Sequence, residues 1–188
     1  MRKIFFVFIV SLFASNIAFG QSVAFNTNLL YLCTTTPNIG VEAKLAKKVT
    51  FDVNAGHNMW RFSSDKRLNH WLVQPELRYW FCEAFNGHFL GIHAHGGQFD
   101  IGGVNIPIGR AVAFKDKRFT GNFIGAGLSY GYQWILCKHW NFEASIGGGY
   151  ARINYIKSAC PDCSPKESEG VYNYWGITRS TLSLIYIF

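Results

Sequence analysis

The chain ends in Thr181-Leu182-Ser183-Leu184-Ile185-Tyr186-Ile187-Phe188, the clearest strand pattern in the sequence. Apolar side chains recur at every second position, as the two-residue period of a β-strand requires. One face of this strand would carry Leu182, Leu184, Tyr186 and Phe188. The strand therefore presents an apolar, partly aromatic face that must be buried or covered.

Composition narrows the class of protein. The 188 residues are 49% hydrophobic and 17% aromatic, and only 15% are charged. So many aromatic residues exclude a disordered chain, and the low charge argues against a cytosolic enzyme, for which about 25% is usual. After residue 20, no apolar run reaches the roughly 18 residues of a membrane-spanning helix. An exported β protein rich in Gly and aromatic residues fits these facts.

The N-terminus reads as an export signal. A basic start, Met1-Arg2-Lys3, is followed by an apolar segment and by Ala18-Phe19-Gly20, which is a small-residue cleavage pattern. We predict a signal peptide over 1–20 and one domain over 21–188. An N-terminal membrane anchor is the alternative. In an exported chain, the aromatic C-terminal strand looks like the assembly signal of bacterial outer-membrane barrels, so we expect the outer membrane. An ordinary edge strand that ends in Phe is the other interpretation.

Alternation along the chain predicts eight strands in an antiparallel up-and-down transmembrane β-barrel. The connections alternate between short turns and longer loops, which is the outer-membrane pattern. The longer loops are expected at 61–69, 100–119 and 156–172, and the first, at 33–37, is shorter. The expected strands are 22–32, 38–46, 49–60, 70–82, 88–99, 120–136, 140–155 and 173–188.

The polar faces of these strands predict a filled interior. Eight strands enclose a space just wide enough for side chains, so a passive pore is not expected. Buried charges must pair, and seven would point inward: Glu42, Lys44, Asp52, Glu76, Arg78, Glu143 and Arg179. Alternatively some, such as Arg179, lie at a rim in water. A soluble barrel would show the same alternation, but aromatic residues gather at strand ends, as they do at membrane interfaces.

Several stretches of the sequence resemble the members of a known protein family. They include Thr27-Asn28-Leu29-Leu30-Tyr31, His70-Trp71-Leu72-Val73-Gln74-Pro75-Glu76-Leu77-Arg78-Tyr79-Trp80-Phe81-Cys82 and Tyr130-Gly131-Tyr132-Gln133-Trp134. Together they resemble a domain-of-unknown-function family of small exported proteins of Bacteroidota, usually taken as outer-membrane barrels. Some members are encoded near fimbrial genes. The resemblance implies a fold and a compartment, and it makes fimbrial or surface proteins candidate partners.

The cysteines suggest a local crosslink. Cys160-Pro161-Asp162-Cys163 has the spacing of a redox motif, but no helical pattern accompanies it. We predict a disulfide between Cys160 and Cys163, since exported proteins meet oxidising conditions. A metal pair completed by His or Cys33, and redox catalysis, are the alternatives. Cys82 and Cys137 fall in adjacent turns and could pair. Because the chain has five cysteines, at least one must stay free or pair elsewhere.

Two histidine groups and one basic loop complete the candidates. His93-Ala94-His95 places two imidazoles on one strand face, either as polar interior residues or as a metal chelate. His57 and His70 flank a loop with Ser63 and Ser64, which leaves open a lipid hydrolase. A predicted anion-binding loop would hold lipopolysaccharide phosphates, unless it is simply solvated; its cations are Arg110, Lys115, Lys117 and Arg118.

The sequence thus predicts a monomeric outer-membrane barrel with a structural or cell-surface binding role. We expect no metal or cofactor and no nucleic-acid partner. The expected partners are outer-membrane lipid, lipopolysaccharide, the barrel-assembly machinery, and fimbrial or surface proteins. An outer-membrane enzyme acting on lipid or peptide, and a soluble periplasmic barrel that binds an apolar ligand, are the alternatives.

Overall fold

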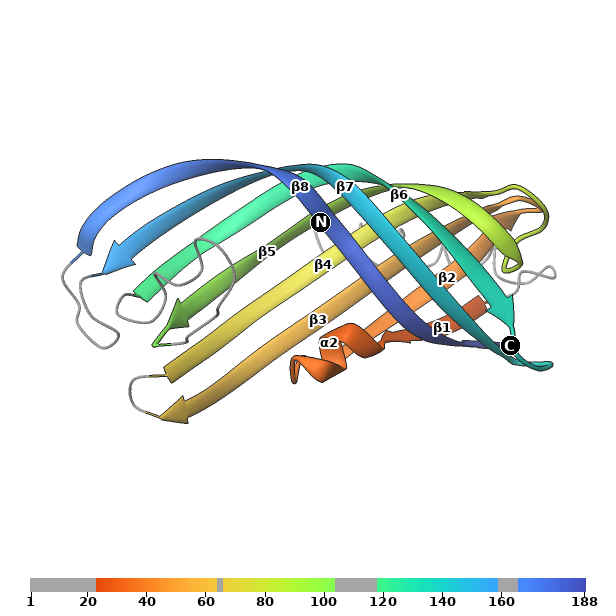
Figure 1. Cartoon of the computed structure of the whole chain (residues 1–188), viewed down its shortest axis with the longest axis horizontal. Helices are drawn as coiled ribbons and strands as arrows, with labels where there is room; N and C mark the ends of the chain where they lie inside the picture. The colour runs from red at the N-terminus through yellow and green to blue at the C-terminus, as the bar shows by residue number, and fades with distance from the viewer. Residues whose placement is uncertain (1–22, 64–65, 104–117, 159–165) are drawn as a thin grey trace, which may run out of the picture.

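The computed structural model describes residues 23–63, 66–103, 118–158 and 166–188. These form eight strands and one short helix: β1 Val23–Asn28, α2 Leu29–Cys33, β2 Asn38–Ala46, β3 Val49–Ser63, β4 Lys66–Trp80, β5 Gly87–Gly102, β6 Arg118–Ile135, β7 Trp140–Ser158 and β8 Lys166–Ile187. Each strand is antiparallel to the next, and β8 pairs with β1 to close the ring (Figure 1). The prediction of eight antiparallel up-and-down strands is confirmed.

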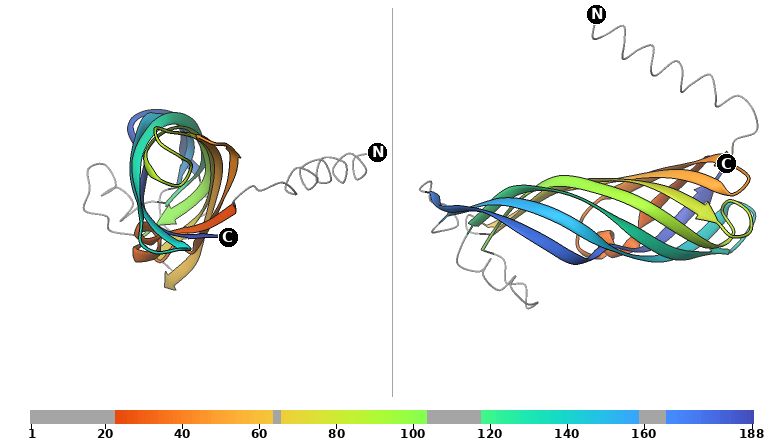
Figure 2. Two further views of the ribbon diagram at one scale, coloured as in Figure 1. Left: turned by 90° about the vertical axis from the view of Figure 1, so that its right-hand side faces the viewer. Right: turned by 90° about the horizontal axis from the view of Figure 1, so that it is seen from above.

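The two ends of the barrel differ. At one end, which we call the turn end, short connections at 47–48, 81–86 and 136–139 lie near Phe188. The opposite end, the loop end, carries the remaining connections; the one between β3 and β4 spans only residues 64–65, and the others are longer. Because β1 and β2 have only 6 and 9 residues, and β8 has 22, only the turn half is enclosed by all eight strands. Beyond α2, strands β3 to β8 continue as a six-stranded sheet (Figures 1 and 2).

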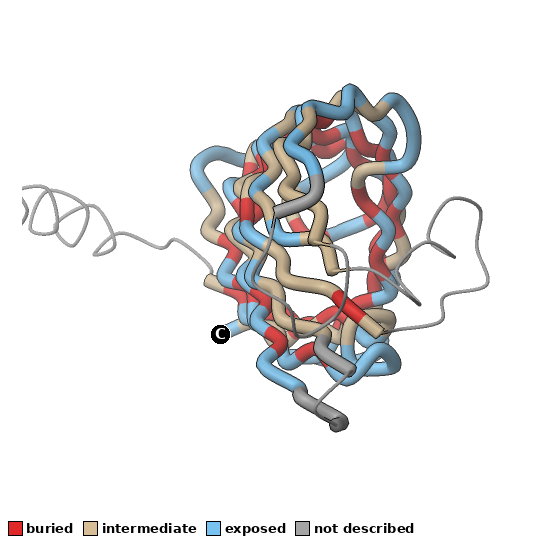
Figure 3. Tube along the Cα trace, turned by 90° about the vertical axis from the view of Figure 1, so that its left-hand side faces the viewer, coloured by how far each residue is buried: buried red, intermediate tan, exposed pale blue. Residues whose placement is uncertain are grey.

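Buried and exposed residues alternate along the strands, as the burial colours in Figure 3 show. On β4, Gln74, Glu76 and Arg78 are buried, whereas Leu77 and Tyr79 are exposed. The interior is therefore mainly polar and the outward face mainly apolar, which reverses the arrangement of an ordinary soluble sheet. Over the described residues, no helix is long and apolar enough to cross a membrane.

The structure corrects three predicted boundaries. β8 begins at Lys166 and pairs with β7 as far as Ser158, so residues 156–158 and 166–172 of the loop expected over 156–172 are strand. The strand expected over 22–32 stops at Asn28, because the Asn28 side chain accepts a hydrogen bond from the Leu30 N–H and caps α2. The long loop expected over 61–69 is mostly strand, since β3 and β4 stay paired as far as Ser63 and Lys66. Its polar composition reads as a loop, but a strand that extends into water can be equally polar.

Candidate functional site

The interior of the turn half is built around Arg78. Its guanidinium donates five hydrogen bonds to carboxylate oxygens. Nε donates to Glu76 at 2.6 Å, Nη1 to Glu42 at 2.8 Å and Nη2 to Asp52 at 3.0 Å. The two remaining bonds, of 2.9 and 3.3 Å, both reach Glu143. Since a guanidinium has five N–H donors, every donor of this buried cation is used.

A second guanidinium joins the same cluster from the opposite wall. Arg179 of β8 lies 3.2 Å from both Asp52 and Glu76. Its Nε and Nη1 atoms are buried without a hydrogen-bond partner. The network thus ties β2, β3 and β4 to β7 and β8 across the barrel. Lys44, expected in the same cluster, is only half-buried near the end of β2.

Aromatic side chains lie beneath this network at the turn end. Trp80 and Phe89 are fully buried, with ring centroids 4.8 Å apart. The Arg78 guanidinium sits 4.7 Å from the Phe89 ring centroid, so the cation rests on an aromatic floor. Trp80 also donates a 2.9 Å hydrogen bond to Thr50. Charges and rings together fill the cross-section of the turn half.

The two histidines of β5 lie above the network. His93 is 2.9 Å from the Thr178 hydroxyl, and its ring centroid is 5.7 Å from that of His95. Both are buried polar residues of the interior. Within the described part of the chain, no group of three or more His, Cys, Asp or Glu side chains could hold a metal ion.

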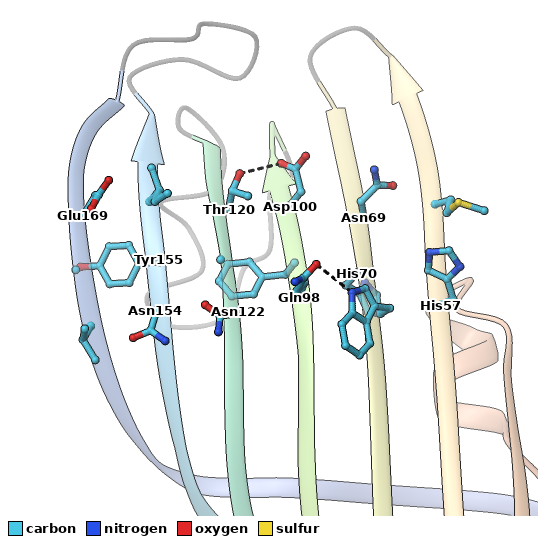
Figure 4. A pocket seen from close by; sticks show the side chains of 17 residues that line it. His57, Asn69, His70, Gln98, Asp100, Thr120, Asn122, Asn154, Tyr155 and Glu169 are labelled. Atoms are coloured by element: carbon cyan, nitrogen blue, oxygen red, sulfur yellow. Dashed lines mark hydrogen bonds between the residues drawn. The ribbon is translucent and has the colours of Figure 1, made fainter. Parts of the chain in front are cut away.

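A hollow of about 880 Å³ opens across six strands near the loop end. Most of its lining belongs to two cross-strand rows on the outward face (Figure 4). The first row is His57, Trp71, Gln98, Asn122, Asn154 and Val171, and the second is Met59, Asn69, Asp100, Thr120, Ile156 and Glu169. Four planar amides and one indole therefore line one cavity.

Contacts among the lining residues hold several of these side chains in place. The Trp71 indole N–H donates a 3.2 Å hydrogen bond to Gln98. Asp100 accepts two hydrogen bonds of 2.7 Å from Arg118. It accepts a third, of 3.3 Å, from Thr120, which Figure 4 marks with a dashed line. By contrast, the Oδ1 atom of Asn69 is buried and has no hydrogen-bond partner. Asn69 thus leaves one buried acceptor of the lining without a partner.

A second cavity, a groove of about 460 Å³, adjoins the hollow. His57 and Trp71 line both cavities. The groove follows the outward face over the register row Ile39, Ala55 and Val73, with Pro37, Gly56 and Leu72 also lining it. Its floor is low because the methyl group of Ala55 stands between two longer side chains. The groove is almost wholly apolar, whereas the hollow combines amide and acidic side chains with aromatic and aliphatic ones.

The remaining predicted residues are dispersed. Arg118 is the first residue of β6 and is paired with Asp100, whereas Arg110, Lys115 and Lys117 lie outside the described residues. The described residues also do not include Cys160, Cys163, Ser64 or the predicted signal peptide. Cys33, Cys82 and Cys137 are exposed and free, so the alternative pairing of Cys82 with Cys137 is not realised.

The histidines considered for hydrolysis fall in the hollow. His57 and His70 both line it. The hollow as a whole was not predicted, because its residues come from six strands. The sequence signal is the change from apolar to amide residues on the outward face, between Trp71 and Asn69 on β4 and between Ile124 and Asn122 on β6.

The C-terminal residues with a predicted assembly role lie on the outward face or rim of β8. Leu182 is exposed and Leu184 half-buried. Phe188 packs edge-on against Phe25 and Tyr186, with centroid distances of 5.4 and 4.9 Å. Its N–H donates to the Val23 carbonyl at 3.0 Å. The terminal aromatic residue therefore sits at the seam where β8 meets β1.

A protein-family model matches almost the whole chain. A family model described as "Protein of unknown function (DUF3575)" matches residues 4–188. No curated protein matches the chain. The resemblance to a family of unknown function is thereby confirmed, and the match covers every strand of the barrel.

Proposed function

Because the chain belongs to this DUF3575 family of proteins of unknown function, we propose its role from geometry: a monomeric outer-membrane β-barrel, closed to flow, with a structural or cell-surface binding role. The main support for this proposal is that the outward face is apolar while the Arg78 network fills the interior. A lipid environment favours this polarity, whereas water opposes it.

The dimensions of the outward face support a membrane location. Exposed apolar residues run from Trp71 on β4 to Phe81, just after its end, and on β6 from Ile124 to Trp134. Each stretch matches the roughly 9–11 residues that a tilted strand needs to cross a bilayer. Aromatic side chains stand at the turn-end border, including Tyr79, Phe81, Trp134 and Trp140, as expected at a membrane interface.

The filled interior supports a binding or structural role over transport. A route for ions through the turn half would have to displace Arg78 and its carboxylates, or the Trp80 and Phe89 rings below them. The polar interior also disfavours the alternative of a soluble barrel holding an apolar ligand. Export by the predicted signal peptide and contact with the barrel-assembly machinery belong to this proposal, as do lipopolysaccharide contacts of the loop at 110–118 and surface-protein partners.

The test combines location with conductance. We expect the protein in the outer-membrane fraction, with a gel mobility that shifts on heating because the folded barrel resists detergent. Reconstituted in planar bilayers, the wild type should show no steady single-channel current. Recovery in the soluble periplasmic fraction would contradict the membrane location, and stable porin-like steps would contradict a sealed interior.

A further inference from the structure

The hollow and the groove form one continuous surface of two chemical kinds. His57 and Trp71 belong to both cavities, and they stand where the outward face changes from apolar to polar. On the polar side the ligand would meet amides, and on the apolar side it would meet Ile39, Ala55 and Val73. A molecule that fills both cavities must itself have a polar head and an apolar tail.

We propose that these cavities bind a glycolipid of the outer leaflet, with its saccharide head in the hollow and an acyl chain in the groove. The assignment rests on the proposed membrane location, because that location brings the outward face into contact with lipid. The junction of head and tail would lie beside Trp71, an aromatic residue of the kind found at membrane interfaces.

The polar lining favours sugar hydroxyls over phosphate. Side-chain amides both donate and accept hydrogen bonds, as hydroxyl groups do, and the hollow holds four of them: Asn69, Gln98, Asn122 and Asn154. None of its described lining residues is lysine or arginine, the usual partners of phosphate.

An aromatic ring is available for the apolar face of a sugar. The indole N–H of Trp71 donates a hydrogen bond to Gln98, which fixes the orientation of the ring. A fixed ring offers its face at little cost in side-chain entropy, and the C–H side of a sugar ring packs against such a surface. Trp71 would thus position the head while the amides read its hydroxyl groups.

The groove supplies the site for an acyl chain. Register places Ile39, Ala55 and Val73 side by side on β2, β3 and β4. The small central residue leaves a channel between the branched side chains of its two neighbours. Methylene groups of a chain lying there would be removed from contact with other lipids and packed against protein.

The groove is tested with a filling substitution and a matched control. Wild-type protein, Ala55→Trp and Ala126→Trp are purified from the outer membrane in mild detergent, and the retained glycolipid is quantified by mass spectrometry. Ala126 is also a small exposed residue, but it lies on β6 outside the groove. We expect retention to fall at least about tenfold in Ala55→Trp, which corresponds to losing roughly two buried methylene groups, and to be unchanged in Ala126→Trp. Equal retention in all three proteins, or none in the wild type, would overturn the site.

The hollow is tested with the saccharide alone. The deacylated saccharide of the same glycolipid should bind the wild type and Ala55→Trp alike, and more weakly than the intact lipid. The double variant Asn69→Ala, Asn122→Ala should lose this binding. An unrelated free oligosaccharide that binds as tightly as the intact glycolipid would instead assign the hollow to soluble glycans and overturn the glycolipid site.

The same preparations separate the two proposals. Suppose that all variants reach the outer membrane and change their gel mobility on heating, but that Ala55→Trp retains as much glycolipid as the wild type. The glycolipid site is then wrong, and the proposal of a membrane barrel is unaffected. If wild-type protein is absent from the outer membrane, the proposed function fails first, and the glycolipid site fails with it.

Discussion

At the scale of single residues, Arg78 shows how a barrel interior can hold excess charge. Four carboxylates surround two guanidinium groups, and only Arg78 has every donor paired. Neutral polar side chains donate further hydrogen bonds to the carboxylates: Asn26 donates to Asp52 at 2.9 Å, and Ser129 donates to Glu76. Such pairing is what makes the burial of these charges tolerable.

Replacing Arg78 by Lys should therefore be severe although the charge is kept. An ammonium has three donors and no planar fork, so it cannot satisfy four carboxylates at once. We expect a loss of about 3–5 kcal/mol in the free energy of unfolding, the range for a broken buried ion pair. Urea unfolding from lipid vesicles measures it. Arg152→Lys, at an exposed position of β7, should change stability by no more than about 0.5 kcal/mol; similar losses in both variants would contradict the network's importance.

At the residue level, alternation alone sets which side of a strand each side chain occupies. Six of the seven residues expected inside are buried in one cluster, because a two-residue period fixes which face each side chain occupies. Lys44 follows the same alternation, but it lies close to the end of its strand, where the interior meets solvent. Position along the barrel axis, which alternation does not encode, separates it from the others.

At the scale of elements, β6 illustrates how glycine makes room inside a narrow barrel. Gly127 faces inward, and a methyl carbon there would lie 2.5 Å from the Gly148 carbonyl oxygen and 2.9 Å from the His93 ring. On the same strand, the Phe89 ring covers Gly131. Large side chains of one strand thus lie over glycines of the next.

Gly127→Ala should accordingly destabilise the barrel. We expect a loss of about 1–3 kcal/mol, since the added methyl overpacks backbone and ring together. The control is Gly96→Ala on β5, where the new methyl would meet only the Phe123 carbonyl oxygen at 3.5 Å and should be neutral. Both are measured as midpoints of urea unfolding. A neutral Gly127→Ala would show that the interior relaxes more easily than its contacts suggest.

The outward face of β6 gives a test of the lipid environment. Leu128 is 64% exposed and lies near the middle of the apolar stretch from Ile124 to Trp134. Leu128→Arg should cost about 2–4 kcal/mol if that point is at the bilayer midplane. Thr120→Arg, on the same face but within the hollow near the loop end, should cost much less. A harmless Leu128→Arg in folding from vesicles would place this face in water.

The short helix α2 is an element that the sequence pattern missed. Leu29-Leu30-Tyr31-Leu32 is apolar without a helical period, so it reads as the continuation of a strand. A five-residue helix has too few turns to show periodicity. Its one signal is the capping side chain of Asn28, and Asn favours turns as readily as helix caps.

At the scale of the whole molecule, the sequence predicts the ring better than the site. Strand count, order and facing follow from alternation and from loop lengths. The hollow depends instead on register, which brings His57, Trp71 and Asn122 into one row although they are distant in the sequence. Register across six strands is set by packing and turn geometry together, and no single segment carries it.

Closure of the molecule gives the last prediction, because β8 and β1 meet only after the chain is complete. Five residue pairs join these strands, from Ala24 with Ile187 to Asn28 with Ser183. Phe188 extends the seam through its bond to Val23 and its contact with Phe25, yet it remains 68% exposed. Its ring therefore contributes little to stability through burial, and it would be accessible to the assembly machinery that we propose as a partner.

Phe188→Ala should lower assembly far more than stability. We expect much less protein in the outer membrane at unchanged synthesis, while the fraction that folds keeps a normal heat-induced gel shift. Phe25→Ala, which removes the other ring of the same contact, is the matched control: it loses the packing but keeps the terminal aromatic residue. Pulse-labelling followed by membrane fractionation distinguishes the two. If both variants assemble equally poorly, the effect comes from seam packing, and if both assemble normally, Phe188 is not an assembly signal.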